Sequence, residues 1–457
     1  MGCQQRIAVK SISALQEMIR QKGELIFCSS KTSTVFPFEQ LDDQYPELAT
    51  TSLVELSTIP SKMKILADNQ VQVQGGVVWE ELDQFVQAHG LELLSYPTER
   101  LATVLAGVAT SATGERSFAF GPLRQQIISL VYLDHRGEKR SLRADRLLVD
   151  HPLFKESRQA SDLLQKYQQL GNNYQTFKNG PTPRLEQESD LMVGFEGQLG
   201  PVVELTLQCR QKSDSIYLYI ATSRWEEMVD SHLDLVRTIH PLRGQIISCE
   251  LLDSNSCKLL PADQRLAKNS DLIFLELDAN GWEEVIEHIL YCCPWIVEQQ
   301  VFEISRQQFF SYRAQIPQLV NERNQRLGMI KKGTDVQVRL EQLGSLLDLY
   351  RQGSKLNIPY LLFGHLGDCH LHFNLLTTAD QVEHANNYLR TFYSQVGQIN
   401  GAPFAEHGVG MIKQQFLKSF LTKEHRDLFN YLKQQMDPDN RFFPQGFMQL
   451  GKEQTVV

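Results

Sequence analysis

A histidine-rich stretch in the last third of the chain holds the residues best suited to chemistry. Residues 364–374 read G-H-L-G-D-C-H-L-H-F-N and follow an apolar run. That run predicts a strand, the glycine and aspartate in the middle permit a turn, and the alternation afterwards predicts a second strand. Because side chains two residues apart share one face of a strand, we expect His370, His372 and Asn374 on one face. His365 ends the incoming strand, so its imidazole can converge with that of His372.

Two converging imidazoles are suited to zinc, iron or manganese, and an open metal site takes a third ligand that is often a carboxylate. The run A-E-H-G-V-G at residues 405–410 offers Glu406. His407 beside it should face elsewhere and is suited to act as a base near neutral pH. A set of satisfied core histidines is the alternative, but three histidines within eight residues make it less favoured. The sequence therefore predicts a metal or catalytic site, provided that the two segments meet.

A second glycine-rich run, G-F-E-G-Q-L-G at residues 194–200, precedes a predicted strand at residues 202–207. Glycines at every third position before a strand indicate a backbone pressed against a flat ligand or a phosphate, although a plain glycine-rich turn has the same composition. The chain has no P-loop, and no G-x-G-x-x-G opens a helix after a strand. A nicotinamide-binding Rossmann site is therefore disfavoured.

The elements that must position these residues change in character along the chain. Residues 1–210 are predicted to form short strands and turns with a few helices. From residue 211 to about 305 the expected order is strand, helix, strand, strand, helix and strand, with the first helix over residues 225–237. This order is the ferredoxin-like layout and fits an inserted cap domain. The remainder mixes amphipathic helices with the strands that carry the polar clusters.

The bulk composition narrows the class of protein. A chain of 457 residues exceeds what one hydrophobic core usually serves, so two or three domains are expected. The net charge of -9 argues against nucleic acid as a partner. The eight cysteines show no C-x-x-C spacing, which favours a reducing compartment. No apolar run has the length of a membrane span, and the first ten residues lack the apolar core of a signal peptide, so we expect a cytoplasmic location or a peripheral membrane one.

Taken in order, these runs resemble the motifs of the FAD-linked oxidases of the vanillyl-alcohol oxidase superfamily, in particular the branch with D-lactate, glycolate and D-2-hydroxyglutarate dehydrogenases. Residues 364–374 are similar to the family's G-H-x-G-D-G-N-x-H-x-N, and residues 406–410 match its E-H-G-V-G. Residues 194–200 resemble its G-S-E-G-T-L-G. Residues 73–82 and 103–114 are similar to its V-x-A-G-V-x-W-x-x-L and T-I-G-G-N-V-A-T-N-A-G-G.

The resemblance implies an α+β fold with three parts. Residues 1–210 would form a two-subdomain FAD-binding domain, and residues 211–405 a ferredoxin-like cap domain that holds the substrate. Residues 406–457 would return to the FAD-binding domain as a C-terminal helical segment. The activity implied is oxidation of a small (D-)2-hydroxy acid, with non-covalent FAD and a divalent metal as cofactors.

Residue by residue, the resemblance implies that His365, His372 and Glu406 hold the metal, with zinc expected in this branch. His407 would take the proton from the substrate hydroxyl. The electrons would pass to an acceptor that the sequence does not identify. For the assembly of the protein, the resemblance allows a homodimer.

Three further positions are implied to bind the substrate. Arg313, in R-A-Q-I-P, stands where the family places an arginine for the substrate carboxylate, and a guanidinium can grip a carboxylate through two hydrogen bonds. Lys332 corresponds to a second cation, with a register that differs by one residue. Asn374 would contact the substrate or order the site.

The residues implied to contact FAD lie in the first domain. No histidine occupies the loop at residues 28–34, so a covalent histidyl link through this loop is not expected. The expected contacts are Ser29, Ser30, Lys31, Thr32, Ser33, Gly76, Pro97, Thr103, Gly107, Thr110, Ser111, Gly114, Gly121, Glu196, Gly197 and Val202.

The chain departs from the family pattern in both halves. The first diphosphate loop, R-G-G-G-T-S in the family, reads C-S-S-K-T-S-T at residues 28–34 and has no glycine, and a Gly-Gly pair is replaced at residues 105–106. Cys369 and His370 replace Gly-Asn, and Phe443 replaces the asparagine of the closing D-P-x-x-x-x-N-P-G-K. His370 is then an extra ligand, a hydrogen-bond partner or a surface residue, and the residues leave all three open.

The departures keep two other functions in view. One is a degenerate, non-catalytic accessory subunit of a larger oxidoreductase, which the lost glycines favour. The other is a metal-free flavin oxidase of an alcohol, sugar or lipid precursor. The intact E-H-G-V-G and the two metal-type histidines count against the accessory subunit, and a metal analysis would separate the metal-free oxidase from the hydroxy-acid dehydrogenase.

Overall fold

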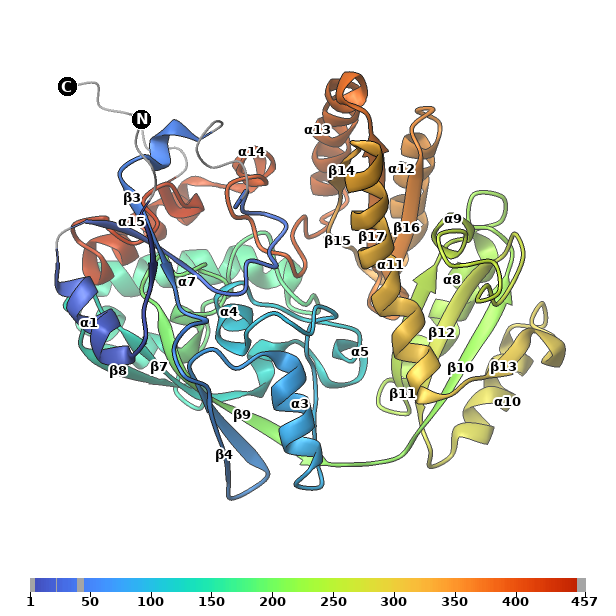
Figure 1. Cartoon of the computed structure of the whole chain (residues 1–457), viewed down its shortest axis with the longest axis horizontal. Helices are drawn as coiled ribbons and strands as arrows, with labels where there is room; N and C mark the ends of the chain where they lie inside the picture. Colours follow the sequence, from blue (N-terminus) through green and yellow to red (C-terminus); the bar gives the residue numbers. More distant parts are fainter. Residues whose placement is uncertain (1–4, 22, 39–44, 450–457) are drawn as a thin grey trace.

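The computed structural model describes residues 5–21, 23–38 and 45–449. These residues form two lobes (Figure 1). The first lobe contains the strands up to residue 211 and the last helices of the chain, drawn in red, while the second contains residues 215–398. None of the described helices is long and apolar enough to cross a membrane. Residues 1–4, on which the expectation of no signal peptide partly rests, lie outside the described part.

The first lobe is built on two sheets. One is parallel with the strand order β1-β3-β2, and the other is antiparallel with the order β4-β5-β9-β7-β8, to which β6 adds by pairing with β9. Alternate side chains of β5 are buried, as the alternation of valine and glutamine predicts. The strands are β1 (Arg6–Ala8), β2 (Glu24–Cys28), β3 (Thr51–Glu55), β4 (Lys62–Leu66), β5 (Gln70–Gln74), β6 (Leu91–Leu93), β7 (Ile127–Leu133), β8 (Lys139–Arg143) and β9 (Val202–Gln211). The helices are α1 (Ile12–Arg20), α3 (Trp79–Gln87), α4 (Val104–Ala109), α5 (Ser117–Phe120), α6 (Pro152–Lys155) and α7 (Arg158–Gly171).

The second lobe is built on one sheet with the order β13-β10-β12-β11-β16-β17-β14, and β15 pairs with β17. The first four strands of this order, with α8 and α10, have the ferredoxin-like connection that the sequence predicts. The histidine-bearing strands β16 and β17 extend the same sheet, because β16 pairs with β11. The strands are β10 (Ser215–Thr222), β11 (Ile246–Leu252), β12 (Asp271–Asp278), β13 (Val301–Glu303), β14 (Ile330–Gly333), β15 (Val336–Gln337), β16 (Tyr360–His365) and β17 (His370–Thr377). The helices are α8 (Asp230–Ile239), α9 (Ser254–Cys257), α10 (Trp282–Cys292), α11 (Arg306–Leu327), α12 (Leu343–Ser354) and α13 (Val382–Gln398).

One predicted helix begins later than expected. The apolar spacing predicts a helix over residues 225–237, but α8 begins at Asp230 and residues 225–227 form a turn. The backbone N–H of Trp225 donates to the buried carboxylate of Asp271 at 2.8 Å, and the Trp225 side chain is fully buried. This contact with β12 fixes Trp225 outside a helical turn, which is information that local spacing does not contain.

The C-terminal segment returns to the first lobe, as the resemblance implies. It contains α14 (Gln414–Leu417) and α15 (Lys423–Met436), and α15 packs against α7. Beyond α15, the N–H of Phe443 donates to the carbonyl of Leu25 at 2.8 Å, and the N–H of Leu25 donates to the carbonyl of Arg441 at 2.8 Å. The end of the chain therefore adds to β2 at the edge of the parallel sheet.

A buried ion pair joins the two lobes. Arg116, just before α5, donates to Glu276 of β12 through Nε at 3.2 Å and Nη2 at 2.6 Å, and to Glu92 through Nη1 at 3.0 Å. Glu276 is fully buried and Arg116 is almost so. Removing one partner from such a pair is costly because the other charge stays buried without compensation.

We predict that Arg116→Met lowers the free energy of unfolding by about 3–5 kcal/mol, because it leaves the Glu276 carboxylate buried without its cation. Urea unfolding followed by circular dichroism measures the change. Arg143→Met is the matched control, since Arg143 pairs with Asp145 at the exposed surface and its loss should leave the midpoint unchanged. Equal midpoints for both variants would contradict the role given to Arg116.

Candidate functional site

The hairpin of β16 and β17 brings three histidines together. The strands pair antiparallel with His365 opposite His370 and Phe363 opposite His372. Cys369 in the turn has φ 53°, a left-handed conformation that closes the connection. The ring centroids of His365 and His372 are 5.9 Å apart, and that of His370 lies 5.1 Å from the first and 4.6 Å from the second.

The carboxylate of Glu406 lies among these rings. Its Oε2 is 3.1 Å from Nε2 of His365, and its Oε1 is 3.4 Å from Nε2 of His372. The two segments that the sequence analysis requires to meet therefore do meet. One ligand atom from each of His365, His370, His372 and Glu406 can be chosen so that all lie within 4.8 Å of one another.

The donor set fits a divalent metal. His365 Nδ1 lies 2.9 Å from Oε1 of Glu250, and His372 Nδ1 lies 3.3 Å from the carbonyl oxygen of Thr334. An imidazole whose one nitrogen donates to such an acceptor presents the lone pair of its other nitrogen, which is the arrangement found around metal-binding histidines. In both residues that other nitrogen is Nε2, the atom nearest Glu406.

The charges in this cluster are strongly coupled. Burial by itself would raise the pKa of Glu406, but the imidazoles of His365, His372 and His407 hold it well below its ordinary value. Burial would lower the pKa of His365, yet the neighbouring Glu250 carboxylate raises it to about 9. Glu406 is therefore ionised and ready to accept from, or share a cation with, the imidazoles around it.

His407 lies at the edge of the cluster and is the most exposed of these histidines, at 38% of its side chain. Its ring stacks on that of His372 with centroids 4.8 Å apart and an angle of 19°. Nδ1 lies 3.6 Å from Oδ2 of Asp335, and Nε2 lies 3.3 Å from Oε1 of Glu406. An exposed imidazole oriented by a buried carboxylate is suited to proton transfer.

Arg313 of α11 is buried next to the cluster and already has two acidic partners. Nη2 pairs with Glu115 and lies 3.2 Å from Oε2 of Glu250. Since Glu250 also holds His365, the arginine connects to the histidine cluster through one carboxylate. Nη1 of Arg313 is buried and has no hydrogen-bond partner among the described residues. This leaves one face of the guanidinium for a further acceptor.

The two other predicted substrate positions lie on neighbouring strands. Asn374 is buried on β17 and its Nδ2 donates to the carbonyl of His372 at 3.2 Å. Lys332 lies on β14, where burial lowers its pKa and the nearby charge of Glu383 offsets only part of this effect. The preceding Lys331 is on the opposite face of the strand, where burial and the nearby Lys413 lower its pKa. Lys413 pairs with Asp335 at 3.1 Å, so the charge that acts on Lys331 belongs to a residue in contact with the cluster.

A cavity in the first lobe separates the loop at residues 28–33 from α4 and ends at Glu196 and Gly410. Ser29 and Thr103 hydrogen-bond across it through their hydroxyls at 2.6 Å, and Lys31 has φ 60° and pairs with Glu55 at 2.9 Å. Hydroxyl groups and one ammonium group therefore occupy the loop where the family has glycines. Such groups can donate hydrogen bonds to the diphosphate in the middle of a dinucleotide. Ten of the sixteen expected FAD contacts line this cavity: Ser29, Ser30, Lys31, Thr32, Ser33, Thr103, Thr110, Glu196, Gly197 and Val202.

The other six expected FAD contacts do not line this cavity, and backbone packing explains several of them. A Cβ on Gly114 would lie 1.9 Å from the carbonyl oxygen of Tyr96 and 3.3 Å from Pro97. A Cβ on Gly107 would lie 3.2 Å from the Trp79 ring. The six are Gly76, Pro97, Gly107, Ser111, Gly114 and Gly121.

Glu196 links the cavity to the E-H-G-V-G segment. Its Oε1 accepts the N–H groups of Val409 at 2.6 Å and Gly410 at 3.0 Å. Burial raises the pKa of Glu196, while these two backbone donors lower it. The glycine-rich run at residues 194–200 and the E-H-G-V-G run at residues 406–410 are therefore in direct contact.

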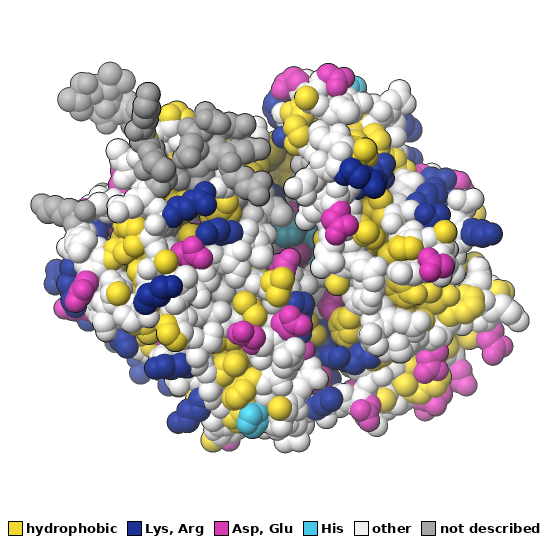
Figure 2. Space-filling model, in the orientation of Figure 1, with side chains coloured by type: hydrophobic (Ala, Val, Ile, Leu, Met, Phe, Trp, Pro, Cys, Tyr) yellow, Lys and Arg dark blue, Asp and Glu magenta, His cyan; other side chains and the backbone are white. Residues whose placement is uncertain are grey.

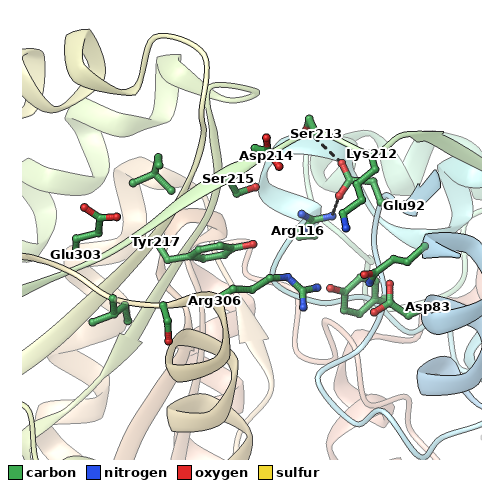
Figure 3. Close-up of a pocket in the computed structure, with 15 residues that line it drawn as sticks. Asp83, Glu92, Arg116, Lys212, Ser213, Asp214, Ser215, Tyr217, Glu303 and Arg306 are labelled. Carbon is green, nitrogen blue, oxygen red and sulfur yellow. Dashed lines mark hydrogen bonds and ion pairs between the residues drawn. The ribbon is translucent and has the colours of Figure 1, made fainter. Parts of the chain in front are cut away.

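A polar cleft opens between the lobes, lined by residues that include Arg116, Lys212 and Arg306. Figure 2 shows a hollow between the two lobes with a histidine side chain visible in it, whereas the described residues that line the polar cleft include no histidine. In Figure 3, Arg306 of α11 extends toward the first lobe, where Arg116 and Glu92 are paired and Lys212 lies close by. The cleft shares Asp83, Tyr96 and Arg306 with a second cavity that reaches Glu115 and Arg313.

Two acidic residues that orient the histidines, Asp335 and Glu250, were not predicted from the sequence. Asp335 accepts the backbone N–H of His407 at 2.9 Å and lies 2.9 Å from Nε2 of His370. Glu250 sits in the fully buried strand β11. A charged residue inside an otherwise apolar strand was the one available signal for Glu250. His370 is fully buried, so the interpretation of it as a surface residue is wrong.

The fold and the site define a two-lobed, flavin-dependent oxidoreductase. The family described as "FAD binding domain" matches residues 47–143, and the family described as "FAD linked oxidases, C-terminal domain" matches residues 226–445. Together the matches cover about two thirds of the chain. The chain belongs to the FAD-linked oxidases.

Several curated relatives are similar over most of the chain. The mitochondrial D-lactate dehydrogenase [cytochrome] of Kluyveromyces lactis is 22% identical over 91% of this chain and 69% of the relative. The D-lactate dehydrogenase of Archaeoglobus fulgidus is 21% identical over 84% and 78%, and the mitochondrial D-2-hydroxyglutarate dehydrogenase of Bos taurus 22% over 80% and 62%. Among solved structures, an alkyldihydroxyacetonephosphate synthase shares the fold with a TM-score of 0.65, at 12% identity over 95% of this chain and 75% of the other.

We predict that Gly364→Ala abolishes metal binding at the histidine cluster. Gly364 has φ 132°, and a Cβ there would lie 2.9 Å from Cδ2 of His372. The ring must then move away from Glu406. Metal content of the purified variant measures the effect. Gly328→Ala is the control, because Gly328 also has a positive φ but no atom within 4 Å of its Cβ position. Full metal occupancy in Gly364→Ala would contradict the geometry.

Proposed function

We propose that the chain oxidises a small (D-)2-hydroxy acid to the 2-oxo acid, with a divalent metal, expected to be zinc, held by His365, His372 and Glu406. One observation carries the proposal: the segment with Glu406 and His407 joins the histidine cluster on one side to the end of the cofactor cavity, at Glu196, on the other. The names of the relatives, D-lactate and D-2-hydroxyglutarate dehydrogenases, support this substrate class.

When bound, FAD supplies a hydride acceptor and the metal supplies a Lewis acid that lowers the pKa of a coordinated hydroxyl. Proton removal falls to His407, which is the exposed imidazole of the cluster. Its Nδ1 faces the buried Asp335, so the proton is taken at Nε2. Asp335 thereby sets the orientation of the ring.

The substrate carboxylate is assigned to Arg313. The buried Nη1 of this residue has no partner among the described residues, and a carboxylate would satisfy it. The inter-lobe cleft gives access, because the cavity that reaches Arg313 shares Arg306 with it (Figure 3). A cationic side chain at the mouth and another at the end would guide an anionic substrate inward.

The first test is an anaerobic absorption spectrum of the purified protein with metal analysis. We expect bound flavin, one divalent metal per chain, and loss of the flavin absorption when the correct D-2-hydroxy acid is added from a panel with both enantiomers. Removing the metal with a chelator should leave FAD bound and stop the bleaching, since the hydroxyl pKa is then no longer lowered.

Two outcomes would replace the proposal. Bleaching by an alcohol or sugar with no stoichiometric metal and no effect of chelator would make the chain a metal-free flavin oxidase. A protein that binds no FAD, even when FAD is added, would be a non-catalytic accessory subunit.

We predict that His407→Gln slows reduction of bound flavin by roughly a hundredfold to ten-thousandfold, because the hydroxyl proton loses its acceptor. FAD and metal content should stay unchanged. Stopped-flow absorption under anaerobic conditions measures the rate. His89→Gln, at an exposed position on the first lobe, is the control. A normal rate in His407→Gln would show that another group accepts the proton.

A further inference from the structure

We infer that the metal of this chain has four protein ligands rather than three, and that His370 is the fourth, through Nδ1. The inference rests on the metal site of the proposed function and concerns a residue that the family pattern lacks, since the family has asparagine at this position. It follows from how His370 is buried, oriented and surrounded.

The orientation of His370 is fixed by Asp335. Nε2 of His370 lies 2.9 Å from Oδ1 of Asp335, and both side chains are fully buried. Asp335 also accepts the backbone N–H of His407 at 2.9 Å and pairs with the Lys413 ammonium at 3.1 Å, which are the surroundings of an ionised carboxylate. An ionised carboxylate only accepts hydrogen bonds, so Nε2 carries the proton and Nδ1 carries a lone pair.

That lone pair points into the cluster. Nδ1 of His370 lies 3.9 Å from Oε2 of Glu406, the oxygen that is also 3.1 Å from Nε2 of His365. Ligand atoms about 2.0–2.1 Å from a tetrahedral zinc are roughly 3.3 Å apart. The present separations are therefore close to those of a filled tetrahedron, and a small inward movement completes it.

All three imidazoles are held by the same kind of contact. Each has one nitrogen held by a protein acceptor, namely Glu250 for His365, Asp335 for His370 and the Thr334 carbonyl for His372. Each presents its other nitrogen toward Glu406. A histidine kept only as a hydrogen-bond partner would not need this match with its two neighbours.

Lys178 is the competitor for Nδ1 of His370. Its Nζ lies 3.4 Å from that atom, but it also pairs with Asp368 at 3.0 Å and donates to the carbonyl of Gly114 at 3.2 Å. The lysine thus keeps two closer acceptors when Nδ1 binds a metal. If His370 served only to link Asp335 to Lys178, its replacement would leave the metal unaffected, and this is the alternative that the experiment separates.

Four protein ligands change what the metal site can do. Three ligands leave the fourth tetrahedral position open for a substrate oxygen, whereas four fill it. In this chain a substrate hydroxyl then binds only as a fifth ligand, and the resting metal is held more tightly than with three ligands.

The experiment uses the full-length protein loaded with Co²⁺, whose visible absorption is intense when four-coordinate and weak at higher coordination. His370→Asn restores the family residue and should weaken Co²⁺ binding by about tenfold to a hundredfold. It should also shift the visible bands, because a water oxygen replaces an imidazole nitrogen among the four ligands. Cys369→Gly, the neighbouring reversion, keeps the left-handed turn and should change neither property.

Unchanged affinity and bands in His370→Asn would overturn the inference. X-ray absorption at the zinc edge of the unmodified protein gives a second measurement that requires no variant to fold: three imidazole ligands are expected, and two would refute His370. Loss of flavin reduction has no bearing on these readouts. A protein that reduces its flavin with two imidazoles on zinc keeps the proposed function and loses this inference, whereas three imidazoles without hydroxy-acid turnover do the reverse.

Discussion

Glu406 reaches the histidines only because the backbone around it is anchored from both lobes. Asp335 in the second lobe accepts the N–H groups of Glu406 at 3.2 Å and His407 at 2.9 Å. Glu196 in the first lobe accepts those of the two residues that end the same segment. Each of these carboxylates would lose its backbone donors from the segment if the segment moved, at about 1–3 kcal/mol for every group left unsatisfied. The position of the whole site depends on this double anchorage.

Burial of so many charges is possible because they alternate. Arg313, Glu250, His365 and Glu406 follow one another at hydrogen-bond distance, so each charge has an opposite neighbour on both sides. Each contact also orients the next group. The same carboxylate that neutralises Arg313 therefore also orients the ring of His365. One network of contacts therefore both compensates the buried charges and orients the histidines.

The first lobe has left-handed backbone conformations at positions where the residue type does not favour them. Lys31 has the left-handed conformation in a loop where the family has glycines, and Phe443 has φ 45° where the family has asparagine. Asparagine and glycine tolerate this region and a bulky aromatic residue does not. Phe443 is held there by its buried ring, which packs edge-on to Phe36 at 5.9 Å. The surroundings impose this conformation on residues that would not choose it locally.

Local patterns in the sequence were sufficient for several parts of this protein. Period-two alternation predicted the strands around His365 and His372, and the order of strands and helices predicted the ferredoxin-like half of the second lobe. These inferences succeed because alternation and helical spacing depend on residues a few positions apart. The collinear motifs further identified the family and the returning C-terminal segment.

Only the tertiary structure decided which groups surround the histidines. Glu250 is 115 positions from His365 and Asp335 is 35 from His370, and no local period connects them. The same holds for Trp225, whose hydrogen bond to Asp271 keeps it outside the helix that its neighbours favour. A buried polar group must find a partner, but which partner it finds depends on how the folded chain brings distant strands together.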